Sequence, residues 1–202
     1  MTKPLAIDLF CGLGGWSEGM LSEGWRVVGF DIDRHVYGEH RYPAQLVIQD
    51  VLTLHGSQFR NADLIVASPP CQAYSYRAMP WSRAKALPPP DNMLFDACFR
   101  IQREACQAAG RHIPLIVENV RGAQKWVGRA RYNYGSFYLW GDVPALMPIA
   151  SKAGIKVGGD WFSDPNSQCR FGSKSPARKM ASAMIAKIPL PLSRHIARTF
   201  KP

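Results

Sequence analysis

A cysteine and a glutamate stand at the ends of two short apolar runs, where their side chains could do chemistry. Cys71 follows the run 63–67 and a Ser-Pro-Pro turn, and Glu118 follows the run 113–117. Apolar runs of this length are typical of buried strands, and α/β proteins bind ligands at the carboxyl ends of parallel strands. A thiol in that position could act as a nucleophile, with the carboxylate as a second reactive group. A lone cysteine is more often packed and inert, so the chemical interpretation depends on its surroundings.

A glycine-rich turn precedes both residues in the chain. The apolar run 4–10 leads into Cys11-Gly12-Leu13-Gly14-Gly15, after which we expect a helix from about Trp16 to Glu23. This order of strand, glycine turn and helix is typical of a dinucleotide or nucleoside cofactor site, because glycine lets the backbone come close to a ligand. The spacing is not that of G-x-G-x-x-G, so it does not indicate pyrophosphate. A tight turn between a strand and a helix would by itself also explain the glycines.

Two aspartates end the next predicted strands. Asp31 follows the run 26–30, about 20 residues past the glycines, where an acidic residue can bond ribose hydroxyls. Asp50 follows the run 46–48 and could accept a hydrogen bond from an exocyclic amine such as that of adenine. Each acid taken singly is as well explained as a helix cap or a surface residue. Their repeated position at strand ends favours a role in binding a cofactor.

Periodicity predicts the remaining elements of an α/β chain. We expect helices at 37–42, 93–109 and 193–200 and a further strand at 136–140. The loop 76–92 contains three consecutive prolines and has a length that is usually functional. We therefore divide the chain into a main domain at 1–140, a small irregular lobe at 141–179 that is rich in Gly, Pro and Ser, and a closing segment at 180–202 that returns to the main domain.

Composition restricts the class of protein. The 202 residues are 47% hydrophobic, enough for the core of one domain, and contain no run of 18 apolar residues that would predict a membrane span. The amino terminus lacks the pattern of a signal peptide. Five cysteines, an odd number without metal-like spacing, favour a reducing compartment and argue against a zinc site.

Charge is distributed unevenly along the chain. Residues 1–120 carry 11 Lys and Arg against 12 Asp and Glu, whereas residues 121–202 carry 14 against 3. A basic half of this kind is the electrostatic signature of a polyanionic partner, above all a nucleic acid. The alternative is a solvated basic face that only aids solubility.

Taken together, these segments resemble the DNA (cytosine-5)-methyltransferase family. Asp8-Leu9-Phe10-Cys11-Gly12-Leu13-Gly14-Gly15 looks like the family's first motif, with Cys11 where Ala is usual. Pro70-Cys71-Gln72 matches its catalytic loop and Glu118-Asn119-Val120 its catalytic carboxylate motif. The likeness covers residues 5–120 and, more loosely, 188–192. It implies a Rossmann-like S-adenosylmethionine-dependent methyltransferase sheet with helices on both faces and a small irregular basic lobe.

The resemblance also implies a reaction. The Cys71 thiolate would attack C6 of a cytosine flipped out of duplex DNA, while Glu118 would hydrogen-bond N3 and the exocyclic amine. Carbon 5 would then take the methyl group of S-adenosyl-L-methionine, leaving S-adenosyl-L-homocysteine. The loop 76–92 would close over the flipped base and exclude water. Residues of the cofactor site would be Phe10, Gly12, Gly14, Gly15, Asp31, Ile32, Asp50, Val51 and Pro70.

One family motif is represented only in part. Arg129-Ala130-Arg131 stands where a Gln-x-Arg-x-Arg motif is usual, but it comes early and lacks the Gln. On this resemblance Arg131 is a third catalytic residue, which would hold the cytosine O2 and support Glu118. The division of roles between Arg129 and Arg131 stays open. For DNA contacts we expect, from the catalytic turn and the basic region, Gln72, Ser75, Arg77, Arg129, Lys152, Lys156, Arg170, Lys174, Arg178 and Lys179.

The large target-recognition region of the family is missing. Only residues 141–178 stand in its place, a compact form that we expect of a bacteriophage or mobile-element enzyme acting in the cytoplasm of a bacterial or phage-infected cell. We expect a monomer with a short or relaxed target, or a protein partner that supplies recognition. Two other functions stay open: methylation of cytosine in RNA, which a basic lobe also suits, and a catalytically inactive DNA-binding relative.

Overall fold

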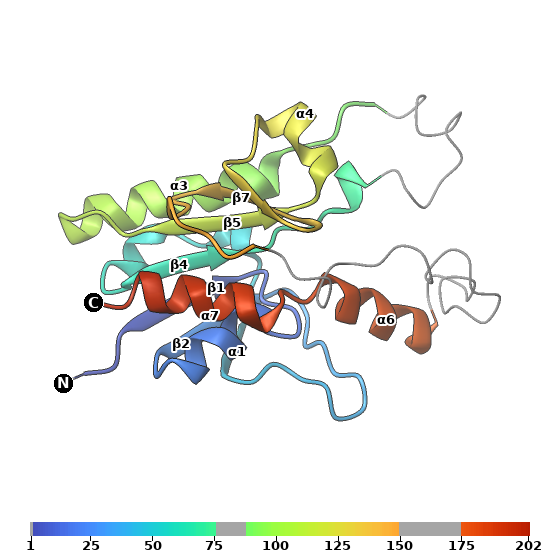
Figure 1. Ribbon diagram of the computed structural model, residues 1–202, viewed down its shortest axis with the longest axis horizontal. Helices are drawn as coiled ribbons and strands as arrows, with labels where there is room; N and C mark the ends of the chain where they lie inside the picture. The colour runs from blue at the N-terminus through green and yellow to red at the C-terminus, as the bar shows by residue number, and fades with distance from the viewer. Residues whose placement is uncertain (1, 76–87, 150–174) are drawn as a thin grey trace.

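A seven-stranded sheet forms the centre of the protein in the computed structural model, which describes residues 2–75, 88–149 and 175–202 (Figure 1). The strand order is β3-β2-β1-β4-β5-β7-β6. The first five strands pair in parallel, and β7 and β6 continue the sheet as an antiparallel hairpin. Their bounds are β1 Leu5–Leu9, β2 Arg26–Asp31, β3 Gln45–Ile48, β4 Leu64–Ala67, β5 Leu115–Asn119, β6 Tyr132–Tyr134 and β7 Phe137–Gly141.

Helices cover both faces of this sheet, which confirms the predicted Rossmann-like α/β class. One face packs against α3 (Met93–Ala109) through a cluster that includes Ile7, Leu9 and Ile101. The other packs against α1 (Gly15–Ser22) and α7 (Leu190–Thr199), where the cluster includes Ala6 and Ile196. Successive residues of β1 thus alternate between the two cores, as the pleat of a strand requires. No helix within the described ranges is long and apolar enough to cross a membrane.

The carboxyl-terminal helix α7 is held tightly against α1. A Cβ atom at Gly19 would overlap Ser193, so the absence of a side chain lets the two helices approach. The carboxylate of Glu23 receives Arg194 Nε at 2.8 Å and Arg198 Nη2 at 3.0 Å. These contacts attach the closing segment to the helix that follows the glycine turn.

Most predicted elements are present, and the predicted helix at 93–109 has the bounds of α3. The predicted helix at 37–42 is wrong: this segment contains only an isolated antiparallel bridge between Tyr37 and His40. Gly38 adopts a φ of 60° there, which an α-helix cannot accommodate.

Several elements were not predicted, among them a strand and a longer helix. The short strand β6 (Tyr132–Tyr134) and the helix α6 (Pro176–Ala186) lie in stretches with weak periodicity, and α6 spans the boundary that we placed between 179 and 180. Ser175 caps α6 by accepting a hydrogen bond from the Arg178 backbone, and Pro176 occupies its first turn, where proline is tolerated. The short helices are η1 Val51–Thr53, η2 Gly56–Phe59, η3 Gln72–Tyr74, η4 Arg121–Ala123 and α4 Gln124–Val127.

Candidate functional site

The strand register brings the predicted site residues to one edge of the sheet. Leu9 of β1 lies opposite Phe30 of β2 and Ala67 of β4, and Ala67 lies opposite Val117 of β5. The glycine turn, Asp31, the Cys71 turn and Glu118 therefore follow neighbouring strands at the same level. Strand order reverses between β1 and β4, the position at which open α/β sheets bind ligands.

The glycine turn has the backbone conformation that its sequence predicts. Gly12 and Gly14 adopt φ values of 50° and 77°, and Phe10 adopts 56°, which is uncommon for a residue with a side chain. A Cβ at Gly14 would overlap Pro43, so that glycine is needed for packing. A Cβ at Gly12 would meet nothing within 4 Å, so the space beside this residue is open. The turn thus exposes backbone next to a free volume.

Asp31 connects the glycine turn to the end of β2. Its Oδ2 accepts the Gly12 backbone N–H at 2.9 Å, and its Oδ1 accepts that of Ile32 at 2.8 Å and lies 3.3 Å from His35 Nε2. Burial alone would raise the pKa of Asp31, but the hydrogen bonds from His35 and Gly12 outweigh it and hold that pKa below its ordinary value. The neighbouring Ile32 is 70% exposed and presents an apolar surface beside this charge.

Asp50 is a helix cap in the structure. Its Oδ1 accepts the Leu52 backbone N–H at 2.9 Å at the start of η1, while Val51 is fully buried in the core. Contact of Asp50 with a cofactor stays a prediction. Contact of Val51 with a cofactor also stays a prediction, because the whole residue is packed in the core.

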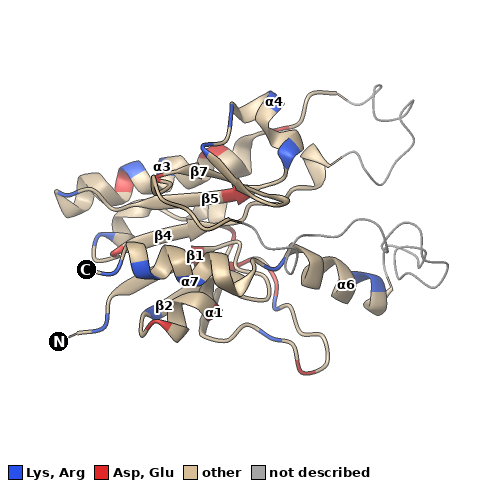
Figure 2. Cartoon of the chain, viewed as in Figure 1, with Lys and Arg blue, Asp and Glu red and all other residues tan. Residues whose placement is uncertain are grey.

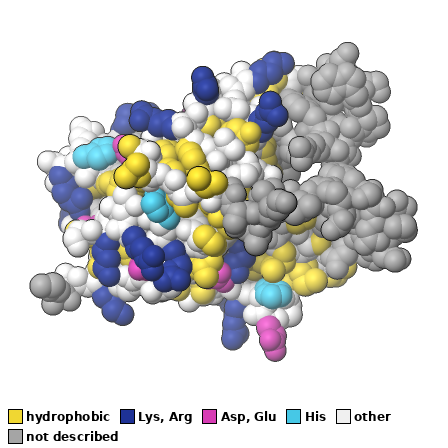
Figure 3. Space-filling model, viewed as in Figure 1, with side chains coloured by type: hydrophobic (Ala, Val, Ile, Leu, Met, Phe, Trp, Pro, Cys, Tyr) yellow, Lys and Arg dark blue, Asp and Glu magenta, His cyan; other side chains and the backbone are white. Residues whose placement is uncertain are grey.

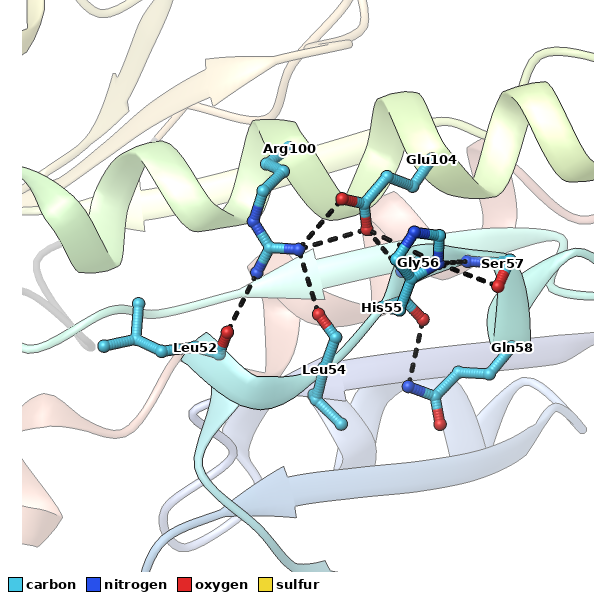
Figure 4. Close-up of polar contacts among 8 residues, drawn as sticks. All are labelled: Leu52, Leu54, His55, Gly56, Ser57, Gln58, Arg100 and Glu104. Carbon is cyan, nitrogen blue, oxygen red and sulfur yellow. Dashed lines mark hydrogen bonds and ion pairs between the residues drawn. The ribbon is translucent and has the colours of Figure 1, made fainter.

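Two residues of α3 brace the segment that follows Asp50 (Figure 4). Arg100 Nη1 donates to the Leu54 carbonyl at 2.9 Å, and its Nη2 donates to that of Leu52 at 3.3 Å. Glu104 accepts the Gly56 backbone N–H at 2.6 Å and pairs with Arg100 at 3.0 Å. We did not single out these two residues from the sequence, because an Arg and a Glu four positions apart look like an ordinary surface pair of a helix.

The Cys71 turn is fixed from two sides. Ser68 Oγ accepts the indole N–H of Trp16 at 3.0 Å, and the Pro69 carbonyl accepts Asn119 Nδ2 at 3.0 Å. Cys71 is half-buried, and its carbonyl accepts the Tyr74 backbone N–H at 3.0 Å. Asn119, next to Glu118, thus connects the end of β5 to the turn that carries the thiol. Of the predicted contact residues on this turn, Pro70 and Gln72 are exposed and Ser75 is half-buried.

Glu118 is a buried carboxylate at the end of β5, with 5% of its surface exposed. It lies opposite Leu139 of β7, which in turn lies opposite Tyr132 of β6. Because side chains alternate along a strand, Glu118 shares the α7 face of the sheet with its neighbour Ile116. Glu118 thus lies at the carboxyl end of β5, and the Cys71 turn follows β4, the parallel strand beside it.

The strand register places the backbone of Arg131 two strands away from Glu118. Arg131 directly precedes β6, so two strand spacings separate it from β5, and the alternation places it on the opposite face from Tyr132 and Glu118. The Arg131 backbone N–H donates to the Leu139 carbonyl at 2.9 Å. Its side chain is exposed, as is that of Arg129. The support of Glu118 by Arg131 thus finds no backing in the strand register.

An open pocket of about 430 Å³ lies beside this hairpin. We call it the basic pocket, and it is lined by Arg121, Gln124, Arg129, Ala130, Arg131, Tyr132, Asn133 and Tyr138. Lys and Arg residues surround α4 in this region (Figure 2). In the space-filling view from the same side, Lys and Arg form separate groups on the surface rather than one continuous patch (Figure 3).

Half of the predicted DNA contacts lie outside the described residues, namely Arg77, Lys152, Lys156, Arg170 and Lys174. Arg178 and Lys179 occupy the first turns of α6. Arg129 is the only described member of the predicted set that lines the basic pocket. These assignments stay predictions.

A buried acid beneath the glycine turn was missed from the sequence. Asp8 is 1% exposed, and its Oδ2 accepts Ser17 Oγ at 2.5 Å. Ser17 Oγ also lies 2.6 Å from Tyr42 Oη, and either hydroxyl can donate in this second bond. Asp8 Oδ1 has no hydrogen-bond partner among the described residues. Burial is the main cause that raises the pKa of Asp8 from 3.8 to about 8.

Comparison with known proteins identifies a family. Residues 5–126 match the family model described as C-5 cytosine-specific DNA methylase. The Type II methyltransferase M.XorII of Xanthomonas oryzae pv. oryzae is 31% identical over 87 residues, a match that covers 37% of this chain and 20% of that protein. The match thus spans about a fifth of the length of that curated relative.

Two solved structures are also similar. A candidate DNA modification methyltransferase encoded within prophage Cp (E. coli) is 28% identical with a TM-score of 0.43, over 62% of this chain and 34% of that one. A methyltransferase of Entamoeba histolytica is 15% identical with a TM-score of 0.48, over 75% of this chain and 58% of that one.

Proposed function

The chain belongs to the C-5 cytosine-specific DNA methylase family, and from this premise we propose that it transfers a methyl group from S-adenosylmethionine to carbon 5 of cytosine in duplex DNA. One observation carries the proposal: the Cys71 turn and the buried Glu118 lie at the carboxyl ends of the adjacent parallel strands β4 and β5, and the glycine turn follows the next strand, β1. A nucleophile, a carboxylate and a cofactor turn at one sheet edge are the components that this reaction requires.

Cys71 is the proposed nucleophile. Attack of its sulfur on C6 forms a carbon–sulfur bond and moves the electrons of the C5–C6 double bond toward C5, which makes a poor nucleophile reactive. The bonds from Trp16 to Ser68 and from Asn119 to Pro69 hold the turn that carries the thiol. Loss of the C5 proton to a base and expulsion of the sulfur then restore the aromatic ring.

Glu118 is proposed to hold the base during this step. A carboxyl group can bond both N3 and the exocyclic amine of cytosine, and it supports protonation of N3 as the thiol attacks. The cytosine must leave the duplex to reach a buried carboxylate, so base flipping is part of the proposal. Asn119 is a further positioning residue, because its amide connects β5 to the Cys71 turn.

The described residues fit S-adenosylmethionine. The open space beside Gly12 admits a ligand close to the backbone, and the exposed Ile32 beside Asp31 suits a nucleoside. Asp8 offers a buried oxygen without a partner among the described residues, below the same turn. When bound, this group supplies an electrophilic methyl group for C5. The residues proposed to hold it are Phe10, Gly12, Gly14, Gly15, Asp31, Ile32, Asp50, Val51 and Pro70.

Methyl transfer from labelled S-adenosylmethionine tests the proposal directly. We expect label in duplex DNA and not in tRNA or other RNA, and bisulfite sequencing should place it on cytosine. Label in RNA alone would favour the RNA alternative, and label in neither, with DNA still bound, would favour an inactive relative. DNA that contains 5-fluorocytosine should trap the protein as a denaturant-stable adduct, because fluorine blocks the final elimination. Absence of that adduct from an active preparation would exclude Cys71 as the nucleophile.

A further inference from the structure

The basic pocket combines three arginines from two segments of the chain. Arg121 comes from η4, whereas Arg129 and Arg131 come from the loop between α4 and β6. All three are exposed, and the remaining lining residues are uncharged. The pocket therefore has three positive charges and no carboxylate in its wall.

These guanidinium groups have no acceptor among the residues that the structure describes, since no hydrogen bond or ion pair joins them to a described side chain or carbonyl. The acid that follows β7, Asp142, is engaged elsewhere: its Oδ2 accepts Gln102 Nε2 at 2.8 Å and the Leu115 backbone N–H at 2.9 Å. Three arginines without a described acceptor that line one open volume favour an anion, and the planar fork of a guanidinium matches the oxygens of phosphate.

The backbone of the pocket is held in place before any ligand arrives. Gln124 Oε1 accepts the Ala130 backbone N–H at 3.1 Å, and Trp140 Nε1 donates to the Gly128 carbonyl at 3.0 Å. Gly128 adopts a φ of 88°, which turns the chain from α4 toward β6. The loop that carries Arg129 and Arg131 is thus fixed at both ends.

The pocket is also connected to the Cys71 turn. Tyr74 Oη donates to Asn92 Oδ1 at 2.9 Å, and Asn92 Nδ2 donates to the Trp126 carbonyl of α4 at 3.3 Å. A Cβ at Gly122 would overlap the Tyr74 carbonyl, so η4 packs directly on η3. A ligand in the pocket would therefore lie on a segment that shares contacts with the proposed nucleophile's turn.

We propose that the basic pocket binds a backbone phosphate of the nucleic acid whose cytosine is presented to Cys71. The inference rests on the proposed function. It gives Arg131 a role other than support of Glu118, because Arg131 would bind the nucleic-acid strand together with Arg121 and Arg129. Phosphate contacts position a strand without reading its sequence. Such a contact suits a chain in which only residues 141–178 stand where the family has its recognition region.

The test is the salt dependence of duplex binding by the full chain, measured by fluorescence anisotropy. Arg129→Gln/Arg131→Gln should flatten the plot of log Kd against log salt concentration by about 0.9 for one lost phosphate contact. Arg26→Gln/Arg103→Gln removes the same charge from two exposed arginines that do not line the pocket and serves as the matched control. Equal slopes for both variants would overturn the proposal.

Duplexes with a single methylphosphonate locate the contact. One neutralised phosphate should weaken binding by the wild type and leave the pocket variant unaffected, and the absence of such a position would also overturn the proposal. Binding of inorganic phosphate at the pocket, with an unchanged duplex slope, would show a site for free anions instead. If the chain methylates DNA but the pocket variant keeps the salt slope of the wild type, the phosphate-binding proposal is overturned and the proposed function stands. Pocket-dependent binding without methyl transfer to any nucleic acid overturns the proposed function alone.

Discussion

The two sides of the sheet edge differ in how their polar groups are used. On the glycine-turn side, Asp31 accepts the backbone of Gly12 and Ile32 and contacts His35, and Asp50 caps η1. On the basic-pocket side, Arg121, Arg129 and Arg131 are exposed and have no acceptor among the described residues. The acids on the glycine-turn side are hydrogen-bonded within the protein, whereas the arginines on the basic-pocket side are exposed and can bind a ligand.

This difference predicts different physical behaviour. Hydrogen bonds within the protein each contribute on the order of 1 kcal/mol and fix the shape of a small-molecule site at any ionic strength. Exposed charges are screened by salt and act mainly on a highly charged partner. The glycine-turn side should therefore respond to substitutions that disturb its bonds, and the basic-pocket side to salt.

The largest expected effect separates chemistry from cofactor binding. Cys71→Ser should lower methyl transfer by several orders of magnitude, because a hydroxyl is a far weaker nucleophile than a thiolate. Calorimetry should show unchanged affinity for S-adenosylmethionine, since the sulfur attacks the base and not the cofactor. Retention of full activity by this variant would refute the covalent mechanism.

A second substitution tests the buried acid of the glycine-turn side through pH. Because the folded-state pKa of Asp8 is raised from 3.8 to about 8, its contribution to stability is fully present below about pH 4. It should be lost progressively as pH rises to about 8, at about 1.4 kcal/mol per pKa unit, because the unfolded state ionises more easily. Asp8→Asn is neutral at every pH and should remove this fall.

Urea unfolding of the wild type and of Asp8→Asn between pH 4 and 9 measures that difference. The two curves of unfolding free energy should lie closest near pH 4. They should diverge by several kcal/mol toward pH 8 to 9, where only the wild type has lost stability. Curves that stay parallel would mean that Asp8 titrates normally, and that the raised pKa of this buried strand residue is not realised.

A third change addresses the brace on α3. Arg100→Met removes two bonds to the carbonyls of Leu52 and Leu54 and should lower stability by about 1–2 kcal/mol. It should also weaken S-adenosylmethionine binding, because the braced turn begins at Asp50. Arg103→Met, at an exposed arginine on the same helix, is the control. Loss of stability with unchanged cofactor affinity would show that the turn is independent of the site.

The sequence was sufficient for what depends on local periodicity. The run 93–109 predicted α3, and the apolar runs ahead of Cys71 and Glu118 predicted two strands, which the structure pairs in parallel as β4 and β5. Local periodicity gave no way to place Arg131, because its face depends on β6, a strand of three residues with little pattern of its own. The contact of Tyr42 with Ser17 bridges 25 positions, and no local signal predicts it. The mistaken helix at 37–42 shows the same limit, since Gly38 and the packing of Pro43 on Gly14 decide that segment.

The smallest expected effect distinguishes two roles of one carboxylate. Asp50 caps η1 and is predicted to bind adenine. A substitution by serine separates these roles, because serine also caps a helix but is too short to replace a carboxylate at a ligand. Asp50→Ser should keep the unfolding free energy and weaken S-adenosylmethionine binding by about 1 kcal/mol. Asp50→Ala should lose both the cap and the contact. Calorimetry and urea unfolding of the pair decide the matter: if Asp50→Ser binds the cofactor like the wild type, the cap is the whole role of Asp50.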